Sequence, residues 1–110
     1  MKKLFTFIIL TIGFTVSAQI ATSGTTNSGT NASAIGYQTS ATNTVSTAMG
    51  RETLASGVTS TAMGYQTSAT NTASTAIGNN STASGITSTA IGNNSTASGE
   101  TSIAMGFETE

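Results

Sequence analysis

Alanine and small polar residues alternate along the chain in a pattern that returns at every fourteenth position. A triplet of alanine, isoleucine or methionine, and glycine recurs at this interval, at Ala34-Ile35-Gly36, Ala48-Met49-Gly50, Ala62-Met63-Gly64, Ala76-Ile77-Gly78, Ala90-Ile91-Gly92 and Ala104-Met105-Gly106. A related triplet lies midway, at Ala41-Thr42-Asn43, Ala55-Ser56-Gly57, Ala69-Thr70-Asn71, Ala83-Ser84-Gly85 and Ala97-Ser98-Gly99. Alanine therefore repeats at every seventh position, whereas the large apolar residue repeats only at every fourteenth.

The density of glycine excludes helices and favours short strands. Each glycine costs a helix roughly 1 kcal/mol, and serine and threonine are poor helix formers too. Strands of about four or five residues, each ended by Gly or Asn, fit better, because these residues enter the left-handed backbone region cheaply at a tight corner. Two strands and two corners fill one repeat, which makes one turn of a solenoid. We therefore predict an all-β fold, a parallel β-roll or β-solenoid, with corners at Gly36, Gly50, Gly64, Gly78, Gly92, Gly106, Asn43, Gly57, Asn71, Gly85 and Gly99.

Strand alternation assigns the inward and outward positions. Small residues that occur in both strands of a turn must face the shared interior, where a narrow roll has room only for alanine and hydroxyl groups. The interior alanines are Ala34, Ala41, Ala48, Ala55, Ala62, Ala69, Ala76, Ala83, Ala90, Ala97 and Ala104. The outward face of the second strand is polar, with Leu54 as its exception.

The outward face of the first strand carries one large apolar residue per turn. With turns stacked ~4.8 Å apart, these residues form a continuous stripe of Ile35, Met49, Met63, Ile77, Ile91 and Met105. Burying all six is worth at most ~9–18 kcal/mol at ~1.5–3 kcal/mol each, against an ordering cost of ~1–2 kcal/mol per residue. A single roll is therefore marginally stable, and we expect self-association through the stripe. The pattern leaves open whether two or three copies associate.

The N-terminal segment differs from the rest of the chain. Lys2 and Lys3 precede an apolar run that ends near Val16, and small residues follow up to Ala18. This order predicts a secretory signal peptide, residues 1–18, cleaved before Gln19. The run is shorter than the ~20 apolar residues of a membrane-spanning helix. Residues 19–31 are expected to form a lead-in or cap, and residues 32–110 about five and a half turns that stay open at the C-terminal end.

Composition narrows the chemistry of the exported chain. Residues 19–110 hold Arg51 as their single cation, four glutamates, and no His, Cys, Asp or Lys. Phosphate contacts need Lys and Arg, so we expect no nucleic-acid partner. Without these residues a Ser–His or Cys–His pair and the usual zinc and calcium ligands are also missing. We therefore expect no enzyme activity, no catalytic or metal-binding residues and no cofactor.

The block at residues 74–85, STAIGNNSTASG, resembles the head repeat of the trimeric autotransporter adhesins, the YadA-like head. That signature reads roughly S-V-A-I-G, then a polar corner, then A-x-G, and the resemblance covers about residues 32–110. It implies a left-handed parallel β-roll, a homotrimer, display outside a Gram-negative cell, and adhesion to host matrix or other cells.

The chain departs from that family in three respects. The position before alanine, often Val in the family, is mostly Thr here, with Ile only at Ile103. No neck, stalk or membrane-anchoring barrel follows the repeats, and no polar cap ends them at Glu110. We therefore expect a fragment, which would reach a membrane only through an anchor that it lacks.

One corner position holds larger side chains, and its role has two interpretations. Tyr37, Arg51, Tyr65 and Phe107 are candidate surface contacts, because aromatic residues and arginine often anchor partners. Alternatively, and in our preferred interpretation, they pack against the next turn or a neighbouring chain. We expect Arg51 and Glu52 to form a solvated charge pair. The pairs Asn79-Asn80 and Asn93-Asn94 are expected to satisfy backbone groups at the corner.

Two other functions remain as alternatives. An ice-binding solenoid needs an array of threonine hydroxyls, and Thr59-Ser60-Thr61 and Thr87-Ser88-Thr89 offer Thr-x-Thr on one face. Val45, Ala73 and Ile103 interrupt these columns, and the apolar stripe shares the face. A disordered, low-complexity surface segment fits the composition but not the regular order of the residues.

Overall fold

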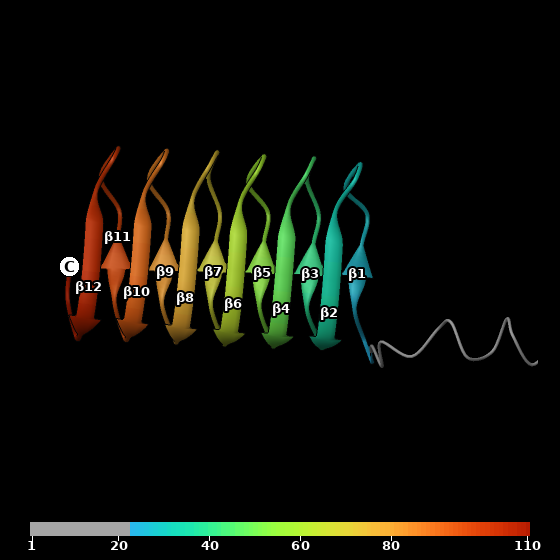
Figure 1. The fold of residues 1–110 in the computed structure, drawn as a ribbon, viewed down its shortest axis with the longest axis horizontal. Coiled ribbons are helices and arrows are strands. Elements are labelled where there is room, and N and C mark those ends of the chain that lie inside the picture. The colour runs from blue at the N-terminus through green and yellow to red at the C-terminus, as the bar shows by residue number, and fades with distance from the viewer. Residues whose placement is uncertain (1–22) are drawn as a thin grey trace, which may run out of the picture.

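The chain winds into a parallel β-solenoid of 14-residue turns, which confirms the predicted fold class (Figure 1). The computed structural model describes residues 23–110, and this part contains strands and no helix. The signal peptide expected at residues 1–18 lies outside the described residues.

Each turn has one long and one short strand. The long strands are β2 (Ser33–Tyr37), β4 (Thr47–Arg51), β6 (Thr61–Tyr65), β8 (Thr75–Asn79), β10 (Thr89–Asn93) and β12 (Ile103–Phe107). The short strands are β1 (Thr26–Asn27), β3 (Ser40–Ala41), β5 (Leu54–Ala55), β7 (Ser68–Ala69), β9 (Thr82–Ala83) and β11 (Thr96–Ala97). The range expected as a lead-in thus contains β1, which pairs with β3.

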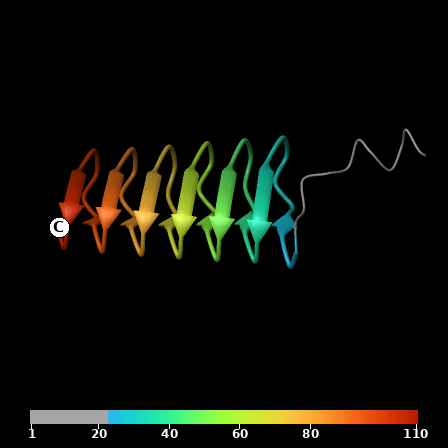
Figure 2. The same ribbon diagram turned by 60° about the horizontal axis from the view of Figure 1, so that its bottom comes forward.

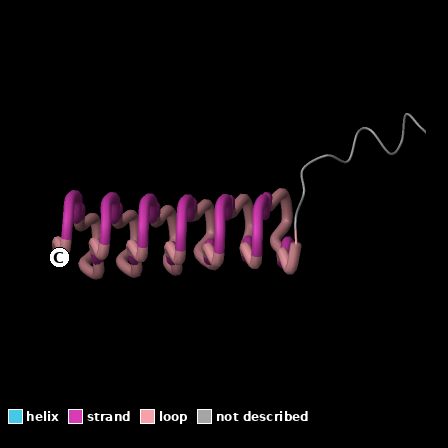
Figure 3. Tube along the Cα trace, turned by 90° about the horizontal axis from the view of Figure 1, so that it is seen from below, coloured by secondary structure: helices cyan, strands magenta, loops and turns pink. Residues whose placement is uncertain are grey.

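The strands form two parallel sheets that face each other across the roll (Figures 2 and 3). One sheet has the order β12-β10-β8-β6-β4-β2, and the other has the order β1-β3-β5-β7-β9-β11. Every paired residue lies opposite its equivalent in the next turn, as Ala62 does with Ala76 and Met63 with Ile77. This uniform register turns each repeated sequence position into a straight column along the roll.

The interior of the roll is filled by alanine and hydroxyl side chains. All the alanines named above as interior residues are buried. A serine column between the sheets closes the corners: Ser60 donates its hydroxyl hydrogen to the carbonyl oxygen of Gly57 at 2.7 Å, and Ser46, Ser74 and Ser88 repeat this bond. A larger side chain has no room between two backbones this close, so the interior is small rather than strongly hydrophobic.

The corners use left-handed residues that the sequence analysis did not expect. Twelve non-glycine residues have φ between 50 and 56°: Asn31, Gln38, Val45, Glu52, Thr59, Gln66, Ala73, Asn80, Thr87, Asn94, Thr101 and Glu108. Each lies two positions after a Gly/Asn corner residue. Asn43, Gly57, Asn71, Gly85 and Gly99 have no positive φ, so the expectation that they supply the left-handed conformation is wrong. Their position starts a β-turn instead, in which the amide of Ser60 donates to the carbonyl of Gly57.

Gly64 illustrates why the other glycine column is fixed. Its φ is 123°, and a Cβ atom there would collide with the carbonyl oxygen of Gly78 in the next turn. The same collision with the following turn recurs at Gly36, Gly50, Gly78 and Gly92. Close stacking of the turns therefore requires glycine on this side of the roll.

The two strands of a turn differ in length more than we predicted, since we expected about four or five residues in each. The long strands have 5 residues and the short strands 2. The β-turn that begins at Asn43 or Gly57 uses residues that would otherwise extend the short strand. The long strand passes through its glycine and ends only at the next left-handed residue, such as Glu52.

Candidate functional site

The outward face of the long-strand sheet carries three parallel columns of side chains. The threonine column consists of Ser33, Thr47, Thr61, Thr75, Thr89 and Ile103. The apolar stripe consists of Ile35, Met49, Met63, Ile77, Ile91 and Met105. The corner column consists of Tyr37, Arg51, Tyr65, Asn79, Asn93 and Phe107.

The strand register brings the six residues of the apolar stripe together. Ile35 pairs with Met49, Met49 with Met63, and so on along the sheet to Met105. Five of them are half-buried by their neighbours in the stack, and Met105 is 61% exposed. The single roll therefore leaves a continuous apolar line in contact with water, which is unfavourable unless something covers it.

The opposite sheet presents a different surface. Its outward positions hold Ser40, Leu54, Ser68, Thr82 and Thr96 in one column, and Thr42, Ser56, Thr70, Ser84 and Ser98 in the next. Apart from Leu54, which is half-buried, all of these side chains are hydroxyl groups that water can solvate. Of the two sheet faces, only the one with the stripe calls for an apolar partner.

Arg51 lies between two aromatic rings of the corner column. Its guanidinium carbon is 5.7 Å from the centroid of the Tyr37 ring and 5.4 Å from that of the Tyr65 ring. Both distances are within the range of cation–π attraction. Three of the four candidate surface contacts are thus stacked on one another across successive turns, whereas Phe107 lies at the far end of the column and is 69% exposed.

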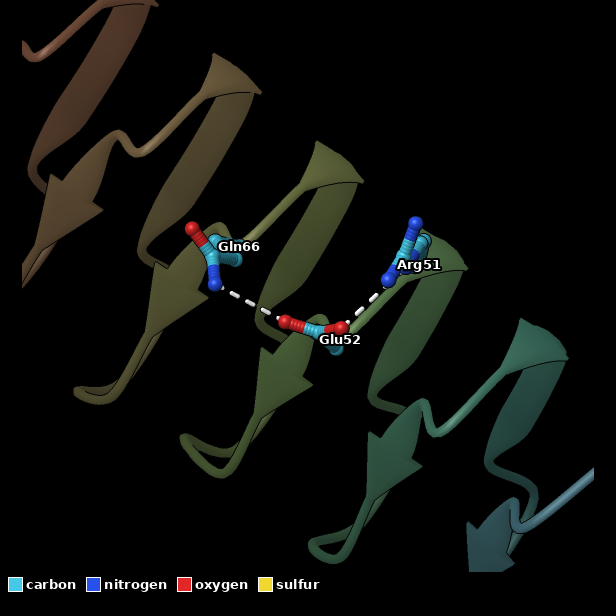
Figure 4. A network of polar contacts seen from close by, with 3 residues as sticks. All are labelled: Arg51, Glu52 and Gln66. Carbon is cyan, nitrogen blue, oxygen red and sulfur yellow. Dashed lines mark hydrogen bonds and ion pairs between the residues drawn. The ribbon is translucent and has the colours of Figure 1, made fainter.

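The same arginine belongs to a polar network that crosses two turns (Figure 4). Its Nε donates to Oε1 of Glu52 at 3.1 Å, and Nε2 of Gln66 donates to the other oxygen, Oε2, at 2.8 Å. The side chain of Arg51 is 60% exposed, so the ion pair itself is worth little. The pair does fix one side of the guanidinium group that lies between the tyrosine rings.

Charge is sparse beside the stripe. Arg51 is the one cationic side chain of residues 23–110, and it is paired with Glu52. The remaining acids, Glu100, Glu108 and Glu110, lie in the last turn. Because nothing along most of the stripe repels a second copy of the same surface, like-charge repulsion does not oppose self-association there.

The asparagines at the corners form hydrogen bonds with other partners than the sequence analysis predicts. Within residues 23–110, the side-chain amide of Asn80 donates to Oδ1 of Asn94 at 2.7 Å, a bond between neighbouring turns. Asn43 and Asn71 satisfy backbone groups instead: each accepts from the next amide at 2.9 Å and donates to the carbonyl of the following turn at 3.1 Å. The backbone role expected of Asn79-Asn80 and Asn93-Asn94 thus belongs to a different column.

The hydroxyl array required for ice binding does not form where the sequence placed it. Thr59 and Thr87 occupy left-handed corner positions outside the strands, whereas Thr61 and Thr89 lie within β6 and β10. The two members of each Thr-x-Thr pair therefore do not share a flat strand face.

The described part of the chain offers little for other kinds of site. Residues 23–110 contain no group of three His, Cys, Asp or Glu side chains placed to hold a metal ion. Within the same range, no helix is long and apolar enough to cross a membrane.

The sequence analysis preferred packing of Tyr37, Arg51 and Tyr65 against the next turn, and Arg51 does contact both rings. It missed the hydrogen bond from Gln66 to Glu52. The signal was present in the repeat spacing, since Tyr37, Arg51 and Tyr65 follow one another at that interval, as do Glu52 and Gln66. Two residues separated by one repeat lie directly side by side in this fold, so complementary pairs at that spacing predict contacts between turns.

Comparison with known families agrees with the repeat geometry. A family model for the YadA head domain repeat, which spans two copies of the repeat, matches residues 28–53, 55–81 and 83–109. The three matches follow one another and take in most of the described residues. Searches of curated proteins and of solved structures gave no match.

Proposed function

Because the chain belongs to the YadA head domain repeat family, we propose that it forms the head of a trimeric adhesin-like module on a cell surface. Head domains of this family form trimers and are structural rather than catalytic. In the proposed assembly, three rolls lie side by side with their apolar stripes facing a common axis.

The apolar stripe is the observation that carries this proposal. It runs the length of the long-strand sheet, it is uncharged, and the roll itself leaves it partly in water. Its side chains gain ~25 cal/mol for each Å² of apolar surface that a partner removes from water. A ring of three copies covers every stripe and leaves no stripe free to recruit further chains.

The assembly is tested by sedimentation equilibrium over a range of chain concentrations, together with circular dichroism. We expect a β-rich species with three times the mass of one chain. A β-rich species that remains monomeric would mean that the stripe has no partner in the chain itself. A mass of two chains would place the stripe in a dimer and remove the trimer from the proposal.

Export is the second part of the proposal. Residues 1–18 have the order of a signal peptide, and adhesins of this family are surface proteins of Gram-negative bacteria. We propose that the mature chain begins at Gln19 and is displayed outside the outer membrane, held there by an anchoring segment. Intact-mass measurement on exported material gives the N-terminus directly: a chain that retains residues 1–18 would contradict cleavage.

Adhesion is the third part. With the stripes at the centre, each roll turns its hydroxyl-bearing sheet and its corners toward the surroundings. We propose that this outer surface contacts host matrix or the surfaces of other cells. Binding of the assembled protein to immobilised matrix proteins, and clumping of cells that display it, test these two targets separately. A properly assembled trimer that does neither would leave a spacer role and remove adhesion.

A further inference from the structure

Strand β12 differs from the other long strands in what it presents outward. Its three outward residues, Ile103, Met105 and Phe107, are all large and apolar. In β8 and β10 the same positions hold Thr, Ile and Asn, so only the middle position is apolar. β12 thus widens the apolar stripe into a patch across the whole face of the sheet.

We propose that this patch packs against β12 of a neighbouring copy and thereby sets the axial register of the assembly. The inference rests on the proposed function, because it concerns how the associated rolls align. Met105 is the last member of the stripe, so the patch is continuous with the surface through which the copies are proposed to meet. A second copy that covers the apolar stripe therefore also covers Ile103 and Phe107, and no separate interface is needed for these two residues.

The geometry of a three-fold ring determines which residues meet. In a cyclic arrangement each roll touches its neighbour through two different flanks. The threonine column of one copy then faces the corner column of the next. When the copies are level, Ile103 of one copy lies beside Phe107 of its neighbour, and both apolar side chains are covered.

Two of the remaining turns cannot fix this alignment by themselves. Residues 74–85 and 88–99 have the same sequence, STAIGNNSTASG, so β8 and β10 present identical surfaces. A neighbour that slides by one turn still finds an isoleucine or methionine opposite most of its stripe. The slide places Ile103 beside Asn93 and Phe107 beside Thr89, which loses the apolar contact and dehydrates polar groups without partners.

Disulfide trapping measures the register between neighbouring copies. The chain has no cysteine of its own, so every disulfide must join the introduced thiols. Two single variants, Ile77→Cys and Ile91→Cys, place a thiol on the stripe in adjacent turns. They carry tags of different mass, are co-expressed, and are oxidised after assembly. Links between two copies of one variant report level alignment, whereas links between the two variants report a shift by one turn.

The matched comparison uses the same cysteines together with Ile103→Thr and Phe107→Asn. These substitutions give β12 the residues that β10 already carries at those positions, so they repeat a turn that the roll tolerates. Sedimentation equilibrium on each sample shows whether the chains still associate.

We expect links between the two variants to be rare with β12 intact. They should increase about fivefold or more in the altered chain, as expected when an apolar contact is lost. Equal amounts of both links with β12 intact, or no increase in the altered chain, would overturn the register proposal while a trimer mass leaves the assembly standing. A monomer mass with β12 intact would overturn both.

Discussion

Four threonine hydroxyl oxygens among residues 23–110 are buried without a hydrogen-bond partner, those of Thr39, Thr53, Thr67 and Thr109. Thr39, Thr53 and Thr67 occupy one column, and each side chain is at most 1% exposed. An unpaired buried hydroxyl group costs ~1–3 kcal/mol relative to water. Valine has the same shape and carries a methyl group in place of the hydroxyl. We therefore expect Thr53→Val to raise the free energy of unfolding by about 1 kcal/mol, measured by urea denaturation at a fixed chain concentration.

A matched control is Ser60→Ala, which also removes a buried hydroxyl group. Ser60 donates from both its hydroxyl group and its backbone amide to the carbonyl oxygen of Gly57, so Ser60→Ala removes the shorter of these two hydrogen bonds and should lower stability by about 1 kcal/mol. Opposite signs for the two variants would show that hydrogen bonding, not size, decides the effect. Destabilisation by Thr53→Val would mean that its hydroxyl group is paired after all.

Val45 adopts a backbone conformation that suits it poorly. Its φ is 56°, in the left-handed region where a β-branched residue is strained by ~1–2 kcal/mol. Asn31 occupies the same position one turn earlier, also with φ 56°, and asparagine tolerates this region well. We expect Val45→Asn to stabilise the fold by about 1 kcal/mol in the same urea measurement.

The control for this prediction is Thr44→Asn, one residue earlier in the same exposed turn. Thr44 has no positive φ, so the substitution should change stability by less than about 0.5 kcal/mol. An equal gain at both positions would trace the effect to asparagine itself and would contradict relief of backbone strain.

At the scale of the strands, the stacked arginine joins β2, β4 and β6 at one edge of the sheet. Cation–π contacts at exposed sites are worth ~0.5–1 kcal/mol. We expect Arg51→Ala to lower the free energy of unfolding by about 1 kcal/mol, from loss of both ring contacts. Arg51→Lys should recover less than half of this loss, because an ammonium group lacks the planar surface that stacks between Tyr37 and Tyr65.

Glu52→Gln separates stacking from the ion pair. It removes the charge that Arg51 faces but keeps an oxygen able to accept a hydrogen bond, and exposed ion pairs contribute ~0–1 kcal/mol. The loss should be less than half of that for Arg51→Ala. If the two losses are equal, the ion pair rather than the rings holds the network together.

The order of strands and corners was predictable because the roll is a one-dimensional stack. Once Ala34 and Ala48 are identified as equivalent positions of one repeat, every position falls into a column, and alternation along the strand assigns its face. The stripe residues Ile35 and Met49 therefore become neighbours in any parallel roll of this period. The exposure of the column along its length also follows, since no other element covers it among the described residues.

The backbone detail was not predictable from residue types. Glycine and asparagine favour left-handed conformations, yet Val45, Thr59 and Thr87 adopt them here. The corner geometry is imposed by the stacked turns above and below, which outweigh a local preference of ~1–2 kcal/mol. Gly57 shows the reverse case, because it is a glycine that does not adopt the left-handed conformation. Its missing side chain makes room for the next turn instead, since a Cβ atom would strike the carbonyl oxygen of Asn71.

At the scale of the whole molecule, the stripe and the hydroxyl face should respond differently to one polar substitution. Met63→Gln places an amide group in the middle of the proposed interface, where its burial without partners costs ~1–3 kcal/mol in every copy. We expect a shift from trimer to monomer in sedimentation equilibrium at micromolar concentration.

Leu54→Gln is the matched control, because Leu54 is the single large apolar residue on the outward face of the short strands. It should leave the trimer mass unchanged. Dissociation caused by Leu54→Gln, with Met63→Gln without effect, would assign the interface to the other sheet.

Because the register is uniform, the number of turns in the roll can change while the contacts between the remaining turns stay the same. Because each residue pairs with its equivalent in the next repeat, an in-frame gain or loss of one repeat adds or removes one complete turn. Residues 74–85 and 88–99 are identical in sequence, so this chain already contains one turn that repeats its neighbour. Each such event extends or shortens the rod by ~4.8 Å. The length of the rod can therefore change in discrete steps of one turn while the surface of every remaining turn stays the same.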